Sequence, residues 1–354
     1  MVRVPSRPPV DTQWRVAVAI EAQHFFSLQD HAAIAEKLGT PDPKPPYKPF
    51  TVYDFVDHLE NHGVLKPKVQ PRQRFTDIER FLGDMERAGL LLNAGRDPLS
   101  GRLYNTTYWG IGSVAKSQTS GLLWLSEAVG PGLIIETYGA VTAPISRPGK
   151  AGIGSGLVLD EWHILTNRHV VKDLQIRAGD EIETPRTPPP SVWCRAWHEP
   201  PTTMRVARDP ICDDYSDGFS DPDEEYGLDL AVIELEQTDD KTGLNTVDGI
   251  IWRDPVATDK TYVFGYPPLP KMLDAYMLVN GGEVVNPRVL TCQNGEVVNP
   301  AVESLKYQRF FLYSSTTRRG NSGGPIVAQD GRVIGVVAHF NIRSRVNYRH
   351  GHRR

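Results

Sequence analysis

Three short stretches in the second half of the chain carry side chains that together can cleave an acyl bond. His169 follows an apolar run, Asp229 precedes another, and Ser322 lies in the turn Gly-Asn-Ser-Gly-Gly-Pro. A serine hydroxyl becomes nucleophilic when an imidazole removes its proton, and a carboxylate holds that imidazole in the correct tautomer. These residue types therefore indicate nucleophilic acyl transfer, with Ser322 as nucleophile, His169 as general base and Asp229 as the orienting carboxylate.

The turn around Ser322 also has the composition of an oxyanion hole. The tetrahedral intermediate of acyl transfer carries a negative oxygen that needs backbone N–H donors. Glycines allow such donors to converge because they have no Cβ atom. We therefore predict that the N–H groups of Gly320 and Ser322 bind the oxyanion.

Other polar residues fit these roles less well. His163 lies inside the preceding apolar run, without the motif that surrounds His169. The acids Asp223, Glu224 and Glu225 are near Asp229 in sequence but not at the mouth of an apolar strand. The sequence shows neither the histidine and cysteine spacing of a metal site nor a glycine loop for a nucleotide, so we expect no cofactor and no metal.

The three motifs, in the order Thr-x-x-His-Val, Asp-Leu-Ala-Val and Gly-Asn-Ser-Gly-Gly-Pro, resemble those of the trypsin-like serine peptidases of the chymotrypsin fold. Within that family they are most similar to the bacterial HtrA-type branch. The resemblance covers about residues 131–340. It implies an all-β double-barrel domain that hydrolyses peptide bonds of protein or peptide substrates through an acyl-enzyme.

The same resemblance implies a substrate-binding pocket. Its base corresponds to Thr316 and its wall to Ala338, His339 and Phe340. Thr316 offers a hydroxyl and no carboxylate, so we expect an uncharged, shallow pocket for small or medium apolar side chains. The family closes its second barrel with a further strand, and the basic segment 341–354 either supplies a poor version of it or leaves the pocket incomplete.

Position 321 bears on control of the activity. It is asparagine where zymogen-type trypsins have an aspartate that pairs with a newly cut N-terminus. This implies control by an attached domain or a partner and not by N-terminal cleavage.

Short apolar runs separated by glycine and proline must position these residues, which is typical of a barrel or sandwich. Asp330-Gly331 between two of the runs predicts a hairpin. The expected strands are Leu133–Thr137, Gly156–Leu159, His163–Thr166, Leu230–Leu235, Tyr262–Phe264, Phe310–Tyr313, Pro325–Ala328 and Val333–His339.

Residues 1–112 have helical periodicity. We expect one helix between about Thr12 and Leu38, a second that begins near Thr51, and a third with a capping box at Thr76–Glu79 and Gly89 at its end. A hairpin follows. Three helices and a hairpin resemble a winged helix-turn-helix domain over Thr51–Gly110. The predicted organisation is therefore a mostly α, winged-helix-like sensor or adaptor domain (1–112), a linker (113–130) and the peptidase domain (131–354).

Charge and composition limit the other functions. The net charge is −4, and the basic and acidic residues of 1–112 nearly balance, so nucleic acid is not the expected partner. The alternative is a winged-helix DNA-binding regulator, or a partner-docking protein, whose peptidase domain is inactive. The basic segment Lys66–Arg74 motivates the DNA-binding version. A third hypothesis is recruitment of the peptidase to a protein partner in a bacterial defence or signalling system.

The compartment is predicted from what the sequence lacks. Three cysteines form no disulfide framework. The first apolar run is too short for a secretory signal, and no stretch has spanning length. We expect a cytoplasmic protein that does not enter the membrane.

Overall fold

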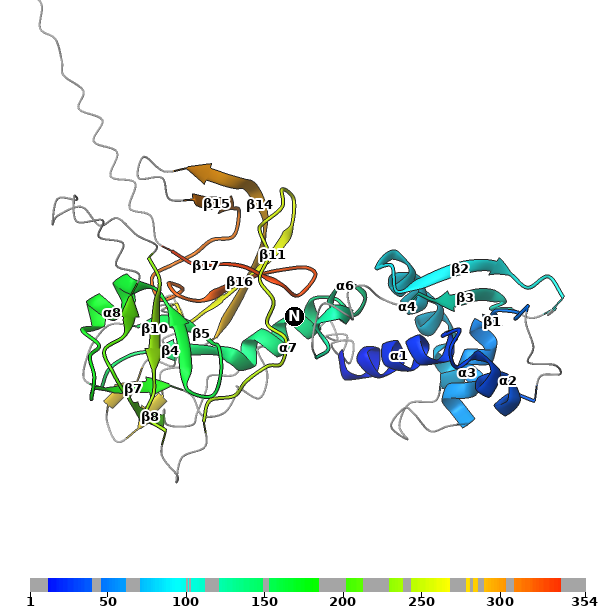
Figure 1. Ribbon diagram of the computed structural model, residues 1–354, viewed down its shortest axis with the longest axis horizontal. Coiled ribbons are helices and arrows are strands. Elements are labelled where there is room, and N and C mark those ends of the chain that lie inside the picture. The colour runs from blue at the N-terminus through cyan, green and yellow to red at the C-terminus, as the bar shows by residue number, and fades with distance from the viewer. Residues whose placement is uncertain are drawn as a thin grey trace, which may run out of the picture.

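The computed structural model describes most of the chain in two lobes, a helical N-terminal lobe and a β-rich C-terminal lobe (Figure 1). The described residues are 12–39, 46–61, 71–99, 101, 103–111, 121–148, 153–184, 202–212, 229–237, 243–267, 278–280, 283–285, 290–303 and 309–338. Among them, no helix is both long and apolar enough to cross a membrane.

The N-terminal lobe combines helices with a small antiparallel sheet in the order β1-β3-β2. Its helices are α1 (Thr12–Phe25), α2 (His31–Lys37), α3 (Val52–Asn61) and α4 (Phe75–Arg87), with a 3-10 turn at Pro71–Arg74. Its strands are β1 (Phe50–Thr51), β2 (Leu91–Arg96) and β3 (Thr106–Gly110). The hairpin expected after the third long helix is confirmed as β2 and β3.

The segment between about Thr12 and Leu38, where one helix is expected, contains two, α1 and α2, because the chain bends between them. The bend buries Phe26, which is 1% exposed. It also lets the Gly110 N–H donate to Phe26 O at 2.7 Å, which joins the bend to β3. A long-range contact therefore interrupts a segment whose local pattern is continuously helical.

The predicted capping box at Thr76 is wrong. Helix α4 begins at Phe75, two residues earlier than a cap at Thr76 implies. Its N-cap Arg74 makes no side-chain capping bond, and Thr76 Oγ1 instead contacts Tyr104 Oη at 3.3 Å. The C-terminal signal is confirmed: Gly89 follows the helix with φ of +68°, the left-handed conformation that glycine adopts without strain.

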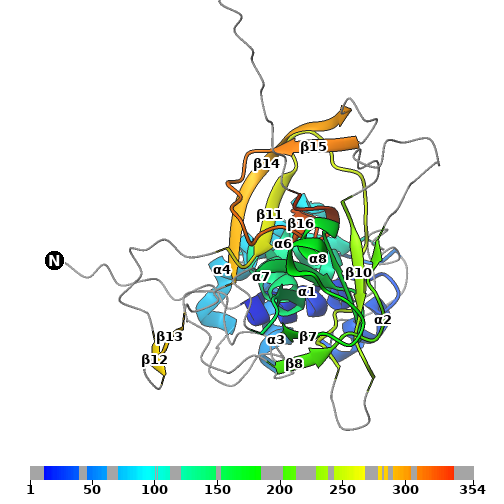
Figure 2. The same ribbon diagram turned by 90° about the vertical axis from the view of Figure 1, so that its left-hand side faces the viewer.

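Two five-stranded antiparallel sheets build the C-terminal lobe, in the orders β4-β5-β6-β10-β9 and β15-β14-β11-β16-β17. Strands β14 and β15 run side by side in both views (Figures 1 and 2). The first sheet contains β4 (Thr142–Ile145), β5 (Gly154–Val158), β6 (His163–Thr166), β9 (Ile211–Cys212) and β10 (Ala231–Glu234). The second contains β11 (Lys260–Gly265), β14 (Thr291–Glu303), β15 (Arg309–Tyr313), β16 (Pro325–Ala328) and β17 (Val333–Val336). Two further hairpins pair β7 (Glu181–Thr184) with β8 (Thr202–Arg205) and β12 (Leu278–Asn280) with β13 (Glu283–Val285).

Most of the predicted strands are confirmed, but Leu133–Thr137 is not a strand. It lies in helix α7 (Pro131–Val141), which Gly130 precedes and Pro131 begins. Proline suits the first helical position because its φ is already helical and its missing N–H would have no partner there. Apolar residues surround this helix on most sides, so its sequence has no clear helical period and is easily taken for a buried strand.

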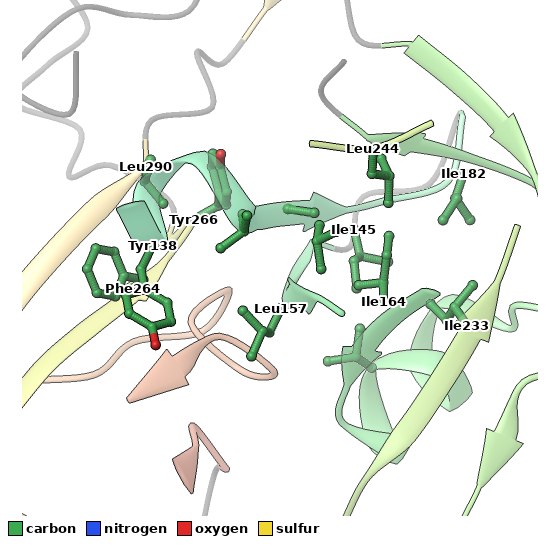
Figure 3. Close-up of a cluster of buried hydrophobic side chains, with 14 of the residues drawn as sticks. Tyr138, Ile145, Leu157, Ile164, Ile182, Ile233, Leu244, Phe264, Tyr266 and Leu290 are labelled. Carbon is green, nitrogen blue, oxygen red and sulfur yellow. The ribbon is translucent and has the colours of Figure 1, made fainter. Parts of the chain in front are cut away.

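Helix α7 and the short helix α6 (Ser126–Val129) connect the cores of the two lobes (Figure 1). Leu125, Ala128, Val129 and Leu133 belong to the N-terminal core. Leu123, Ile134, Ile135 and Tyr138 belong to the C-terminal core, which Figure 3 shows around Tyr138, Phe264 and Tyr266. The Tyr138 hydroxyl donates to the carbonyl oxygen of Gly331, in the β16–β17 turn, at 2.7 Å. Burial raises the pKa of Tyr138.

A partly buried ion cluster lies near the same turn. Arg253 contacts both oxygens of Asp259 at 2.7 and 3.0 Å, and its Nε donates to Asp330 at 2.8 Å. Burial favours the neutral form of Asp259, but the hydrogen bonds from Arg253 and from the Val256 N–H outweigh it, so the pKa of Asp259 is lowered. The charged carboxylate therefore stabilises the fold.

We expect Asp259→Asn to lower the free energy of unfolding at pH 7 by about 2 kcal/mol, the size of a lost hydrogen bond to a charged group. Because the pKa of Asp259 is below its ordinary value of 3.8, its contribution is complete above that pH and is lost as the pH falls through the lowered value. Urea denaturation of both proteins should therefore show a smaller difference at pH 3 than at pH 7. An equal difference at both would contradict the assignment.

Candidate active site

His169 lies in the first turn of helix α8 (Arg168–Leu174), directly after β6. Asn167 between them has extended backbone angles, so the chain leaves the strand straight and then turns into the helix. Val170, Val171 and Leu174 anchor α8 in the core. The His169 side chain stays about one third exposed, which gives its ring access to a substrate.

Asp229 holds His169 through two hydrogen bonds. The His169 backbone N–H donates to Asp229 Oδ1 at 2.9 Å, and His169 Nδ1 lies 2.5 Å from Oδ2. The antiparallel register of β6 and β10, in which Thr166 faces Ala231, brings the two residues together. Because a carboxylate only accepts, the contact fixes the proton on Nδ1 and leaves Nε2 as a base.

Ser322 lies in the turn 320–324, which leads into β16, and it is 6% exposed. Gly320 and Gly323 have φ of +93° and +86°. A Cβ atom on Gly323 would lie 2.1 Å from Ser155 O and 2.3 Å from Thr166 Oγ1, so only glycine fits there. The turn therefore lies against the end of β6, from which His169 follows.

Two backbone donors remain available in this turn. The N–H groups of Asn321, Gly323 and Gly324 donate to Arg318 O, Val337 O and Asn321 O. Those of Gly320 and Ser322 donate to no acceptor among the described residues. The two donors predicted for an oxyanion hole are thus the two N–H groups of the turn 320–324 that have no acceptor in the parts of the chain that the structure describes.

No hydrogen bond joins Ser322 to His169 among the described residues. Within the described part of the chain, Ser322 Oγ has no hydrogen-bond partner. In enzymes without substrate such contacts are often long and tighten only in the complex. The geometry thus combines a histidine held by a carboxylate, a serine, and a turn with two N–H groups that have no acceptor among the described residues, which are the groups that acyl transfer requires.

The competing histidine occupies a different position. His163 begins β6, at the end opposite to Thr166, and its Nδ1 lies 2.8 Å from Asp160. This contact with Asp160, in the loop that precedes β6, explains why a histidine is present at position 163. His163 is therefore a useful comparison for His169.

The predicted pocket residues are only partly described. Thr316 is exposed in the segment after β15, and Ala338 is half-buried after β17. His339, Phe340, the acids Asp223–Glu225 and the tail 341–354 lie outside the described residues. β15 and β17 are the outer strands of their sheet.

Sequence reasoning missed Ser155 and Asn167. Ser155 is fully buried and its Oγ donates to Gly320 O at 2.6 Å. Asn167 Nδ2 donates to Asp229 O at 2.7 Å and so holds the backbone of the acid. The sequence signal for Ser155 was its position between Gly154 and Gly156. Glycines in a strand indicate close packing, and a Cβ atom on Gly156 would lie only 2.4 Å from Ile164 Cγ2.

No group of histidine, cysteine, aspartate and glutamate suited to a metal ion occurs among the described residues.

Comparison with protein families matches residues 154–336 to the trypsin-like peptidase domain. Among solved structures, that of Deg5 matches with 18% identity, covering 58% of this chain and 81% of that one, at a TM-score of 0.37. The inactive form of the Rv3671c protease of M. tuberculosis matches with 15% identity, covering 60% and 84%, at a TM-score of 0.35. No curated protein gave a match.

Proposed function

The chain belongs to the trypsin-like peptidase family, and on that basis we propose that it is a serine endopeptidase acting on protein or peptide substrates. The observation that carries the proposal is the pairing of His169 with Asp229 at 2.5 Å, together with a turn that carries Ser322 and two N–H groups without an acceptor in the described part of the chain.

The proposed reaction proceeds in two halves. Ser322 Oγ attacks the scissile carbonyl carbon while His169 Nε2 takes its proton, and the Gly320 and Ser322 N–H groups bind the resulting oxyanion. His169 then gives the proton to the leaving amine, and the C–N bond breaks to leave an acyl-enzyme. In the second half His169 takes a proton from water, which attacks the ester carbonyl carbon. The ester C–O bond then breaks, and His169 returns the proton to Ser322 Oγ.

Labelling with a fluorophosphonate tests the proposal, because this reagent reacts with an activated serine. We expect labelling of the parent chain and none of Ser322→Ala or His169→Ala. His163→Ala is the matched control and should label normally, since His163 pairs with Asp160 away from the turn. Labelling that does not depend on Ser322 would disprove the proposed nucleophile.

We also propose that the N-terminal lobe controls the peptidase through α6 and α7. These helices contribute side chains to both cores. At the end of α7, Thr142 O accepts a hydrogen bond from the Tyr266 hydroxyl at 3.2 Å. A Cβ atom on Gly320 would lie 2.5 Å from Tyr266 O, so continuous packing leads from α7 to the catalytic turn.

The surface of α4 favours a protein partner over nucleic acid. In a winged helix-turn-helix domain the corresponding helix would enter the major groove, where phosphates attract basic side chains. Here the charged residues of the helix include more acids than bases: Asp77, Glu79, Asp84 and Glu86 against Arg80 and Arg87, with Asp84 paired to Arg15 of α1. The winged-helix assignment, a cytoplasmic location and a role in bacterial defence or signalling remain predictions.

The specificity prediction concerns the residue on the amino side of the cleaved bond. A buried Lys or Arg needs a carboxylate partner to offset its desolvation. Thr316, at the predicted base of the pocket, supplies only a hydroxyl, so we expect cleavage after small or medium apolar residues. Mass-spectrometric profiling of a peptide library would measure this preference. Predominant cleavage after Lys or Arg would contradict the assignment of Thr316.

A further inference from the structure

Ser155 ties the catalytic turn to the first sheet. It is the second residue of β5 and is 0% exposed. Its N–H donates to Ser322 O at 2.8 Å and its Oγ donates to Gly320 O at 2.6 Å. These two carbonyls belong to the peptide units on either side of the one that carries the Ser322 N–H. Ser155 therefore holds the two peptide units that flank the Ser322 N–H, which is a predicted oxyanion donor.

The direction of the Ser155 hydroxyl is fixed by its second partner. The Tyr266 N–H donates to Ser155 Oγ at 2.9 Å. A hydroxyl has one proton to donate and lone pairs to accept with. Because Tyr266 supplies a donor and Gly320 O can only accept, the Ser155 proton must point to Gly320 O. The Ser155 hydroxyl thus links the end of β11 to the turn 320–324, and only one direction of its proton satisfies both partners.

The other polar side chain of the turn does not provide this support. Asn321 is fully buried, but neither its Oδ1 nor its Nδ2 has a partner among the described residues. Gly320 has no side chain, and its φ of +93° imposes no preference on a residue without a Cβ atom. The peptide unit after Gly320 is held at its N–H end by the bond from Asn321 to Arg318 O and at its carbonyl end by Ser155.

We propose that Ser155 is a positioning residue for the oxyanion hole, an inference that rests on the proposed function. Without its hydroxyl the peptide unit after Gly320 keeps the Asn321 N–H bond to Arg318 O but loses the bond at its carbonyl, so the Gly320 and Ser322 N–H groups are held less firmly toward one shared target. Loss of a whole oxyanion donor lowers kcat by about 10²–10³-fold. A misoriented pair should lower it by about 10–100-fold, with KM changed less than threefold, because the interaction forms only in the transition state.

The test compares two buried serines of the same lobe. Ser155→Ala keeps the backbone N–H and removes only the hydroxyl bridge. Ser146→Ala is the matched control: Ser146 is also 0% exposed, and its Oγ donates to Glu183 Oε2 at 2.8 Å. Both are assayed with one peptide substrate, well below the melting temperature of each variant. We expect the kcat loss in Ser155→Ala alone. A kcat within twofold of that of Ser146→Ala would overturn the inference.

A second readout does not need activity. Amide hydrogen exchange of residues 321–324 should be at least about tenfold faster in Ser155→Ala and unchanged in Ser146→Ala. If the parent chain proves inactive, the proposed function fails, and exchange alone decides whether Ser155 orders the turn: unchanged rates would overturn that claim. If the parent is active, faster exchange with an unchanged kcat would also overturn it.

Discussion

Replacement of Ser322 by alanine should lower kcat for peptide hydrolysis by roughly 10⁶-fold, the loss expected when one member of a cooperating triad is removed. The physical reason is that no other group can form the acyl-enzyme, so His169 has no hydroxyl to activate. The N–H groups of Gly320 and Ser322 would remain and could still stabilise an oxyanion formed by water, so a small residual rate is expected.

The Ser322 hydroxyl makes no hydrogen bond with the described residues, so its removal should leave the protein folded. Circular dichroism should therefore give a melting temperature within about 2 °C of the parent value, as expected for a substitution that leaves no polar group unpaired. Active-site titration of the parent and a discontinuous assay of the variant would measure the ratio of rates. A variant that keeps more than 1% of the parent kcat would rule out Ser322 as the nucleophile.

The sequence predicted local structure best at the short motifs that stand beside apolar runs. The His169, Asp229 and Ser322 motifs stand beside strands that the apolar runs located, and the structure places His169 against Asp229. The strand register explains why His169 and Asp229 meet, since pairing Thr166 with Ala231 leaves few positions for the residues that follow and precede them. Local patterns sufficed because both residues lie at strand ends.

The errors occurred where distant contacts decide local structure. Helix α7 was predicted as a strand because both lobes bury it, and burial on most sides removes the helical period. The α1–α2 bend depends on Gly110, more than 80 residues away in sequence. Ser155 is likewise visible only through its bonds to Gly320 and Ser322, which no local pattern encodes.

Replacement of Asp229 by asparagine is the second large expected effect, and its reason lies in the two hydrogen bonds to His169. Asparagine has one oxygen and one NH₂ group in place of two oxygens. If its oxygen accepts the His169 backbone N–H, as Oδ1 does at 2.9 Å, its NH₂ group faces Nδ1. Nδ1 must then accept, the imidazole proton moves to Nε2, and the ring can no longer take the proton of Ser322.

We therefore expect Asp229→Asn to lower kcat/KM at pH 7 by about 10⁴-fold, as is typical when this tautomer is lost, with little change in stability. Asp160→Asn is the matched control, because Asp160 contacts His163 Nδ1 at 2.8 Å in the same lobe but away from the turn. It should keep the parent rate. NMR of the imidazole nitrogens would detect the proton on Nε2 of His169 in Asp229→Asn. If that variant keeps more than a tenth of the parent kcat/KM while the proton has moved, the tautomer of His169 does not limit the reaction and Asp229 has another role.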